Sequence, residues 1–434
     1  MPLFEDKKLK NIQQGNISLP FFDEITKLAK LHSVRVYFVG GCVRDMILGN
    51  NILDVDIVPF GIDYKKYADL LQRCIKAKKI IFKDNVRLIK KKFVIDISKP
   101  RGEDIYKDLT KRDFTINNLA LTMEKEIIGL KEDIFNGIIK AVYPESFHDD
   151  PLRMLRGVRF ISVFDFELDD FTYRLLCKNK SFIKRPSKER VYDELYKITS
   201  GNNFIKAINV LVKSELLFEI IPELTSLKQY EINIEKAPIN IVAIMISSLE
   251  KTDKITIENK FSTNRRFVLI FATIFNYLLK YSALMSSEKI IQIMSTLKFP
   301  GKTIKQISAI INNMKEFWQL MDLGNKDKLL HYIYDHYDYM GDIIIIASND
   351  ISESFRGINK IKKYISGITS ILRSFKIKRK RYITGNDLLC LGIPEGPKIG
   401  IILYKLHFML VTDKLCDKPS AIIYFKQHMR GKIT

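Results

Sequence analysis

The sequence is poor in the residues that build disulfide frameworks and metal clusters. It has only five cysteines in 434 residues, an odd number with no Cys-x-x-Cys pair, and six scattered histidines. These features argue against a disulfide scaffold and against a zinc site. His331 and His336 lack the spacing of metal ligands, so we interpret the histidines as ordinary surface or core residues. A reducing compartment is the simplest setting, and we expect a cytoplasmic protein.

Long apolar runs are also missing. The most apolar stretch, 267–279, contains Asn276 and is shorter than the roughly 20 residues that span a bilayer. Residues 1–8 include several charged side chains and no apolar core of a signal peptide. We therefore expect no membrane association and interpret 267–279 as a buried helix.

Acidic residues are outnumbered by basic ones, 50 against 71, which gives a formal charge of +21. Such a chain attracts polyanions by long-range steering and counterion release. A lysine-rich genome would produce the same excess, so charge alone does not identify an RNA partner. The length is sufficient for about two to four domains.

The stretch 38–56 carries the most informative pattern. An apolar run ends at Gly40 and Gly41, a helical segment follows, and the next strand contains Asp54 and Asp56. Side chains alternate along a strand, so both carboxylates leave the same face, where they can hold a pair of Mg²⁺ ions for phosphoryl transfer. Amides of a glycine turn at a helix start favour a triphosphate. Each piece alone is usually structural, but their combined order predicts nucleotidyl transfer.

Two further blocks contain paired donors and acceptors. Arg112 and Asp113 could hydrogen-bond a ribose 2′-OH, although Asp113 could equally cap a helix and Arg112 form a surface pair. Asp149, Asp150 and Arg153 lie within one helical turn. There, a carboxylate can accept from the exocyclic amine of cytosine or adenine while the arginine donates to the ring, which would select C and A. The simpler alternative is that Asp150 and the following proline merely start a helix.

The periodicity predicts alternating strands and helices up to about residue 145. Asp63 is expected to cap a helix at 65–75, and strands are expected at 79–82, 86–89 and 93–97. Asp96 lies in the last of these strands, as either a third metal-binding carboxylate or a solvent-facing acid. From about residue 146 helical periodicity dominates.

Together the three blocks resemble the signatures of polymerase-β-like nucleotidyltransferases, and within them the class II branch of CCA-adding enzymes and bacterial poly(A) polymerases. The resemblance implies an α+β fold, with a small mixed α/β head at 1–145 and an all-helical neck, body and tail at 146–215, 216–320 and 321–434. It also implies two Mg²⁺ ions, CTP and ATP as substrates, the 3′ end of tRNA as acceptor, and no obligate protein partner.

The resemblance assigns roles to individual residues. Asp54 and Asp56 would be catalytic and would bind metal, with Asp96 as a candidate third ligand. Nucleotide-binding roles are implied for Gly40, Gly41, Arg44, Arg112, Asp113, Asn117, Asp150, Arg153, Arg156 and Arg159. The chain departs from the family pattern at Lys111 (usually Arg), Asn118 (usually Ala) and Asp149 (usually Glu). Glu189 and Arg190, in a segment that resembles the neck helix, would brace the base-reading helix.

A basic run precedes a segment at 384–403 that resembles the family's RNA-binding tail. The run is either a solvated face or a set of phosphate contacts formed by Lys376, Lys378, Arg379, Lys380 and Arg381.

The number and kind of nucleotides added depend on a segment outside these three blocks. Segment 98–111 is short, whereas family members that add all three nucleotides often have a longer loop there, so a CC-adding or A-adding enzyme is an alternative. Poly(A) polymerase is another, since it has a similar head. A non-catalytic RNA-binding protein is disfavoured by the intact Asp54-x-Asp56 pair.

Overall fold

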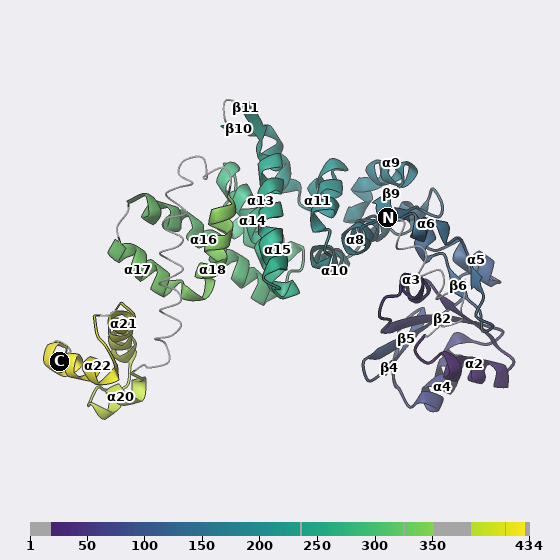
Figure 1. The fold of residues 1–434 in the computed structure, drawn as a ribbon, viewed down its shortest axis with the longest axis horizontal. Helices are drawn as coiled ribbons and strands as arrows, with labels where there is room; N and C mark the ends of the chain where they lie inside the picture. Colours follow the sequence, from purple (N-terminus) through teal and green to yellow (C-terminus); the bar gives the residue numbers. More distant parts are fainter. Residues whose placement is uncertain (1–18, 235–236, 324–325, 351–382, 413, 430–434) are drawn as a thin grey trace. The chain divides into compact units, whose positions relative to one another are not determined.

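The computed structural model describes residues 19–234, 237–323, 326–350, 383–412 and 414–429 (Figure 1). The chain divides into two compact units, unit 1 at 1–222 and unit 2 at 223–434. No helix in these described ranges is long and apolar enough to cross a membrane.

The first half of unit 1 is a mixed sheet with helices on both sides. Its elements are α2 (Phe22–Leu31), β1 (Arg35–Val39), α3 (Gly41–Leu48), β2 (Asp54–Phe60), α4 (Tyr64–Ile75), β3 (Lys78–Ile81), β4 (Asn85–Lys90), β5 (Phe93–Ser98), α5 (Ile105–Leu109), η2 (Thr115–Asn117), β6 (Ala120–Leu121) and β7 (Ile127–Ile128). The strands of this described sheet follow the order β3-β4-β5-β2-β1-β6-β7. Helices α2 and α4 pack together on one side of the sheet, and α3 lies on the other (Figure 1).

Within this sheet, β2 and β5 are the parallel pair, and the other pairings are antiparallel. The register places Asp56 opposite Asp96. Side chains at paired positions lie on the same face of a sheet, so the sheet itself brings these two acids together.

Helix α4 begins as its sequence predicts. The side chain of Asp63 accepts hydrogen bonds from the amides of Lys65 and Lys66 at 3.0 and 3.1 Å. Its apolar face is buried, and full burial of a side chain such as Leu71 contributes roughly 2 kcal/mol. The helix thus anchors one side of the sheet.

The second half of unit 1 is mainly helical. It contains α6 (Glu132–Phe135), β8 (Ile138–Ile139), α7 (Ser146–Asp149), α8 (Leu152–Phe164), β9 (Glu167–Leu168), α9 (Asp170–Asn179), η3 (Lys180–Lys184), α10 (Lys188–Ser200), α11 (Phe204–Lys213) and α12 (Leu216–Ile220). Helix α8 packs against α10 and α11. The hydroxyl of Ser162 on α8 donates to the carbonyl of Ile198 on α10 at 2.6 Å, so the two helices are held at close range.

Unit 2 consists largely of helices, and the first of them, η4, begins at Pro222, the last residue of unit 1. Its elements are η4 (Pro222–Gln229), β10 (Glu231–Ile234), β11 (Ala237–Asn240), α13 (Ile241–Glu258), α14 (Thr263–Tyr281), α15 (Ser287–Thr296), α16 (Gly301–Leu323), α17 (Lys326–Asp335), α18 (Tyr337–Asn349), α20 (Gly385–Cys390), α21 (Pro397–Val411) and α22 (Lys418–His428). The apolar stretch at 267–279 lies in α14, which is buried from Arg266 to Leu278. Arg266 forms a buried ion pair with Asp253 on α13 at 2.6 Å.

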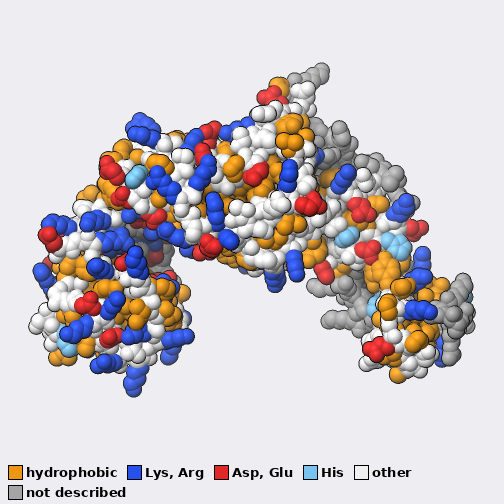
Figure 2. Space-filling model, turned by 180° about the vertical axis from the view of Figure 1, so that it is seen from behind, with side chains coloured by type: hydrophobic (Ala, Val, Ile, Leu, Met, Phe, Trp, Pro, Cys, Tyr) orange, Lys and Arg blue, Asp and Glu red, His pale blue; other side chains and the backbone are white. Residues whose placement is uncertain are grey.

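The predicted fold class is confirmed, since a mixed α/β head is followed by helices. Three short strands interrupt the region predicted to be all-helical: β9, which pairs with β8 of the head, and β10, which pairs with β11. The predicted boundaries between head, neck, body and tail remain predictions. Lys and Arg side chains are spread over the face seen in Figure 2, on both units.

Candidate active site

The turn between β1 and α3 brings a backbone into close contact with an arginine. Gly40 has φ 72° and ψ −126°, a conformation that L side chains rarely adopt. A Cβ atom at this position would lie 3.0 Å from Nη1 of Arg112. Glycine is therefore required at Gly40 both by the backbone angle and by the approach of the guanidinium.

Three carboxylates gather where β2 and β5 run side by side. Asp54 is exposed and Asp56 half-buried on β2, and Asp96 lies opposite Asp56 on β5. Burial, followed by the charges of Asp96 and Asp54, raises the pKa of Asp56 to about 6. Arg87 binds Asp96 through two hydrogen bonds, Nε to Oδ1 at 2.9 Å and Nη2 to Oδ2 at 2.8 Å.

These contacts decide which oxygens could bind a metal. In the described part of the chain no hydrogen bond or ion pair engages the carboxylates of Asp54 and Asp56, whereas both oxygens of Asp96 are occupied by Arg87. Within that same part, no three His, Cys, Asp or Glu side chains form a complete ligand set. Asp54 and Asp56 fit a divalent cation that keeps water or phosphate oxygens as its other ligands, as Mg²⁺ does.

Arg112 and Asp113 are adjacent in sequence but bond to different partners. Nη2 of Arg112 donates to the buried Asp108 at 2.8 Å. The carboxylate of Asp113 lies 2.6 Å from Nη2 of Arg156 and accepts from Nδ2 of Asn117 at 3.1 Å. Burial alone would raise the pKa of Asp113, but the Arg156 charge and the hydrogen bonds lower it. Asp113 is therefore held as a carboxylate inside unit 1.

Arg44 is buried beside this cluster. Its Nη1 donates to Oδ1 of Asn117 at 2.5 Å, and its Nη2 bonds to Asp45 at 3.0 Å. The guanidinium carbon lies 4.5 Å from the ring centroid of Phe164, within cation–π range. Arg44 thus connects α3 with η2 and α8.

The turn between α7 and α8 holds the predicted base-reading pair. Helix α8 begins at Leu152 with Pro151 as N-cap, one residue later than a cap at Asp150 would give, because Asp150 is the C-cap of α7. Asp150 still accepts from the amide of Leu152 at 3.2 Å, and it bonds to Arg190 at 3.1 Å. Arg153 is buried and donates to the carbonyl of Lys111 at 3.0 Å.

Asp150 and Arg153 open into one cavity of about 560 Å³, whose wall is formed by polar and charged residues. It is lined by Arg101, Thr110, Lys111, Tyr143, Asp149, Asp150 and Arg153. The short segment 98–111 therefore supplies part of the wall. Sequence patterns did not identify Arg101 or Tyr143 as site residues, since neither belongs to a block of paired donors and acceptors.

A second cavity of about 360 Å³ contains other predicted residues. It is lined by Arg44, Asp45, Asn50, Asn51, Arg159, Phe160, Val163 and Phe164. Arg44 and Arg159 thus line this cavity, whereas Asp150 and Arg153 line the larger one.

Helix α10 braces α8 through one predicted and one unpredicted residue. Arg190 reaches Asp150, as the pattern suggested. Glu189 is exposed, and the buried brace comes instead from Glu194, which accepts from Nη1 of Arg159 at 2.9 and 3.0 Å. Burial lowers the pKa of Arg159, and the Glu194 charge counteracts this.

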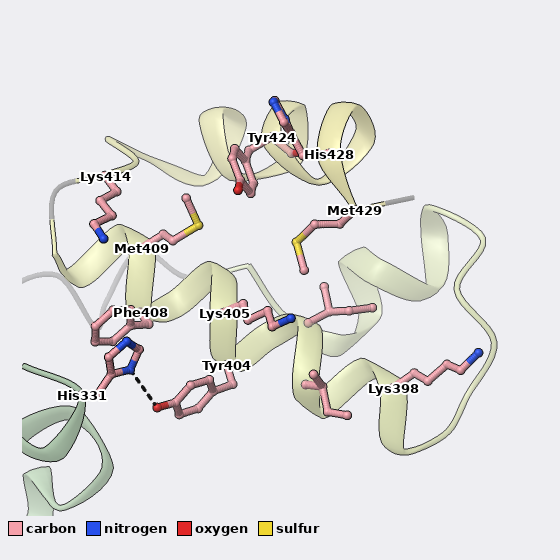
Figure 3. Close-up of a pocket in the computed structure, with 12 residues that line it drawn as sticks. His331, Lys398, Tyr404, Lys405, Phe408, Met409, Lys414, Tyr424, His428 and Met429 are labelled. Carbon is pink, nitrogen blue, oxygen red and sulfur yellow. Dashed lines mark hydrogen bonds between the residues drawn. The ribbon is translucent and has the colours of Figure 1, made fainter. Parts of the chain in front are cut away.

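The predicted RNA contacts Lys376, Lys378, Arg379, Lys380 and Arg381 lie outside the described residues. Within unit 2, a cavity of about 680 Å³ combines rings and cations (Figure 3). Lys398, Lys405 and Lys414 line it, and the rings of Tyr404 and His331 lie with an interplanar angle of 14°. Aromatic rings beside lysines are typical of surfaces that bind single-stranded nucleic acid.

Three family models match the chain in order. Residues 36–107 match the poly A polymerase head domain, 165–228 the probable RNA and SrmB-binding site of polymerase A, and 275–425 the putative tRNA nucleotidyltransferase domain 2.

Curated relatives match along nearly the whole chain. A CCA-adding enzyme of Streptococcus suis (strain 05ZYH33) is 26% identical, covering 96% of this chain and 98% of the relative. One of Staphylococcus aureus (strain MSSA476) is 25% identical, covering 90% and 92%.

Solved structures share the fold. The Thermotoga maritima CCA-adding enzyme complexed with tRNA has a TM-score of 0.71 at 22% identity, covering 95% of this chain and 97% of that one. A CCA-adding enzyme in complex with CTP has a TM-score of 0.71 at 22% identity, covering 97% of this chain and 98% of that one.

Proposed function

Because the chain belongs to the family of class II CCA-adding enzymes, we propose that it adds CMP and AMP, from CTP and ATP, to the 3′ end of tRNA without a template. The observation that carries the proposal is the pair of carboxylates on β2, Asp54 and Asp56, which no side chain of the described residues engages. Because the proposed acceptor is tRNA, the proposal includes a cytoplasmic location.

The chemistry is a nucleotidyl transfer. The 3′-oxygen of the RNA forms a bond to the α-phosphorus of the nucleotide, the bond from that phosphorus to the β-phosphate bridging oxygen breaks, and pyrophosphate leaves. Nucleotidyltransferases of this family generally use a divalent metal, and we assign two Mg²⁺ ions to Asp54 and Asp56. When bound, they would lower the pKa of the 3′-hydroxyl and neutralise the phosphate charge.

The other residues bind and orient the nucleotide. At the start of α3 the backbone amide of Gly41 is offered to the triphosphate, since the amide of Gly40 already donates to the carbonyl of Leu119 at 2.9 Å. Arg44 adds positive charge next to it. Arg112 and Asp113 are proposed to recognise the ribose, with Asn117 and Arg156 holding Asp113 in place.

Base selection is assigned to the cavity formed by α7, α8 and segment 98–111. Asp150 and Arg153 place an acceptor and a donor at its wall. Cytosine and adenine both present an exocyclic amine next to a ring acceptor, whereas uracil and guanine present the opposite pattern. A fixed acceptor and donor would therefore favour CTP and ATP. Arg159 supports this helix through Glu194.

The RNA acceptor would contact unit 2. The cavity with Lys398, Lys405 and Tyr404 offers cations for phosphates and a ring for a base. The basic run 376–381 remains a predicted contact.

The test offers the purified protein a tRNA that ends at its discriminator base, with Mg²⁺ and labelled CTP and ATP, separately and together. We expect two additions with CTP alone and three with both nucleotides. A product that stops at two with both nucleotides would identify a CC-adding enzyme. Addition of one A to a tRNA ending in CC, but no C, would identify an A-adding enzyme, and a long ladder with ATP would identify a poly(A) polymerase. No turnover on any 3′ end would contradict the proposal in favour of an RNA-binding protein.

A further inference from the structure

Tyr143 joins two charged side chains of the 560 Å³ cavity. Its hydroxyl lies 2.8 Å from Nη1 of Arg153 and 2.8 Å from Oδ2 of Asp149. Because a guanidinium only donates and a carboxylate only accepts, the directions of these bonds are fixed. Arg153 donates to the tyrosine oxygen, and the tyrosine hydroxyl donates to Asp149.

The ring of Tyr143 also packs against the same arginine. The guanidinium carbon of Arg153 lies 5.6 Å from the ring centroid, within cation–π range. Tyr143 therefore contacts Arg153 with both its hydroxyl and its ring. It lies outside α8, the helix that carries Arg153.

Arg153 has three further acceptors, the hydroxyl of Ser146 at 2.9 Å, the carbonyl of Ser146 at 3.4 Å and the carbonyl of Lys111 at 3.0 Å. Tyr143 differs from all three because its hydroxyl is itself bonded to a carboxylate. In the described residues no direct hydrogen bond joins Asp149 to Arg153, so the hydroxyl is the bridge between them. The Asp149 side chain is 54% exposed, with Nδ1 of His148 3.9 Å from its other oxygen, so the 2.8 Å bond from Tyr143 is its shortest side-chain contact.

We propose that Tyr143 is a positioning residue for nucleotide selection. It fixes the plane of the Arg153 guanidinium and ties Asp149 to it, so that donors and acceptors face the edge of the incoming base in a constant arrangement. The chain has Asp149 where the class II motif has Glu, and the tyrosine hydroxyl extends the reach of this shorter carboxylate to Arg153. The inference rests on the proposed function and adds a specificity determinant to it.

The test compares full-length wild type with Tyr143→Phe and with the control Tyr106→Phe. The control removes a hydroxyl from an exposed tyrosine of the same unit that does not line the cavity. Steady-state incorporation is measured with CTP, ATP and UTP, CTP binding is measured by calorimetry, and a thermal melt checks folding. Loss of a hydrogen bond to a charged group should lower kcat/KM for CTP about tenfold, mostly through KM. The preference for CTP over UTP should fall with it, while the control matches wild type.

A second pair of variants separates positioning from general support of the fold. Asp149→Asn weakens the bridge from its exposed end and should lower the CTP preference in the same way. Combined with Tyr143→Phe, it should lower the CTP preference little further, because both changes break the same chain of hydrogen bonds from Asp149 through Tyr143 to Arg153. An unchanged CTP preference in a folded Tyr143→Phe protein, or fully additive effects in the double variant, would overturn the inference alone. A wild type that incorporates neither CTP nor ATP would overturn the proposed function and this inference with it.

Discussion

The carboxylate of Asp113 lies 2.6 Å from the guanidinium of Arg156, and this contact joins two segments that are separate in the sequence. Asp113 precedes the short helix η2, whereas Arg156 belongs to α8. Only 6% of the Asp113 side chain is exposed. The segment proposed to recognise the ribose is therefore held in place by the helix proposed to read the base.

Asp113→Asn should destabilise unit 1 at neutral pH. Removing one partner of such a pair should cost roughly 2–3 kcal/mol, less than for a fully buried pair because about a third of the Arg156 side chain is exposed. The single tryptophan, Trp318, lies in unit 2, so its fluorescence would not report on unfolding of unit 1. The measurement should therefore be hydrogen exchange of the α8 amides.

The same pair predicts a pH dependence. The folded state lowers the pKa of Asp113 below its ordinary value of 3.8, so its contribution is fully present above that value. This stabilisation is lost as the pH falls from 3.8 through the pKa of Asp113 in the folded state. The difference in protection between wild type and Asp113→Asn should stay constant from pH 7 to about pH 5 and shrink below about pH 4. A difference that grows on acidification would contradict this.

Glu194→Gln should loosen α8 from α10. Glu194 is buried and binds Arg159 with both oxygens, so its loss leaves a poorly paired guanidinium at a cost of roughly 2–4 kcal/mol. Glu189→Gln, an exposed change on the same helix, should stay within about 0.5 kcal/mol. Exchange rates of α8 amides measure both variants. Equal effects would mean that Glu194 is not the brace.

Gly40→Ala should reduce activity more than Gly61→Ala. Both glycines have positive φ, at 72° and 89°, so an alanine at either is strained by roughly 1–3 kcal/mol. Only the Cβ atom at Gly40 would meet Arg112, at 3.0 Å, whereas a Cβ at Gly61 has nothing within 4 Å.

The measured quantity is kcat/KM for CTP, with the melting temperature of each variant as control. We expect an additional loss of roughly ten- to hundredfold for Gly40→Ala through the displaced arginine. Equal losses at the two positions would show that only backbone strain matters.

Local signals in the sequence predicted much of the head. Asp63 caps α4 as its position before an amphipathic stretch indicates, and the strands end within one or two residues of the predicted bounds. The placement of the Asp54 and Asp56 carboxylates on one face of β2 follows from the period-two alternation of side chains along a strand. The position of Asp96 beside Asp56 could not be predicted in this way, because the parallel pairing of β2 with β5 is a long-range contact that the sequence of a single strand does not encode.

Tertiary contacts account for what the sequence did not predict. Glu194 and Tyr143 acquire their partners only when separate elements pack, and nothing in their local pattern distinguishes them from surface residues. The alternative role of Asp150 as the start of α8 holds only in part, because Asp150 is the C-cap of the short helix α7 and Pro151 is the N-cap of α8, although the Asp150 side chain accepts from the amide of Leu152. The β10–β11 pairing was missed because so short a strand pair is specified mainly by its packing context.

The central claim is that the carboxylates of Asp54 and Asp56 carry the nucleotidyl transfer. The direct test measures CMP incorporation into tRNA and tRNA binding for Asp54→Asn and Asp56→Asn, with Asp69→Asn, a half-exposed aspartate on α4 that pairs with Lys79, as the control. An amide lacks the charge that a divalent cation needs, so incorporation should fall by roughly a thousandfold or more while the tRNA dissociation constant changes little. The control should behave as wild type. Incorporation that survives in Asp54→Asn and Asp56→Asn would contradict the account.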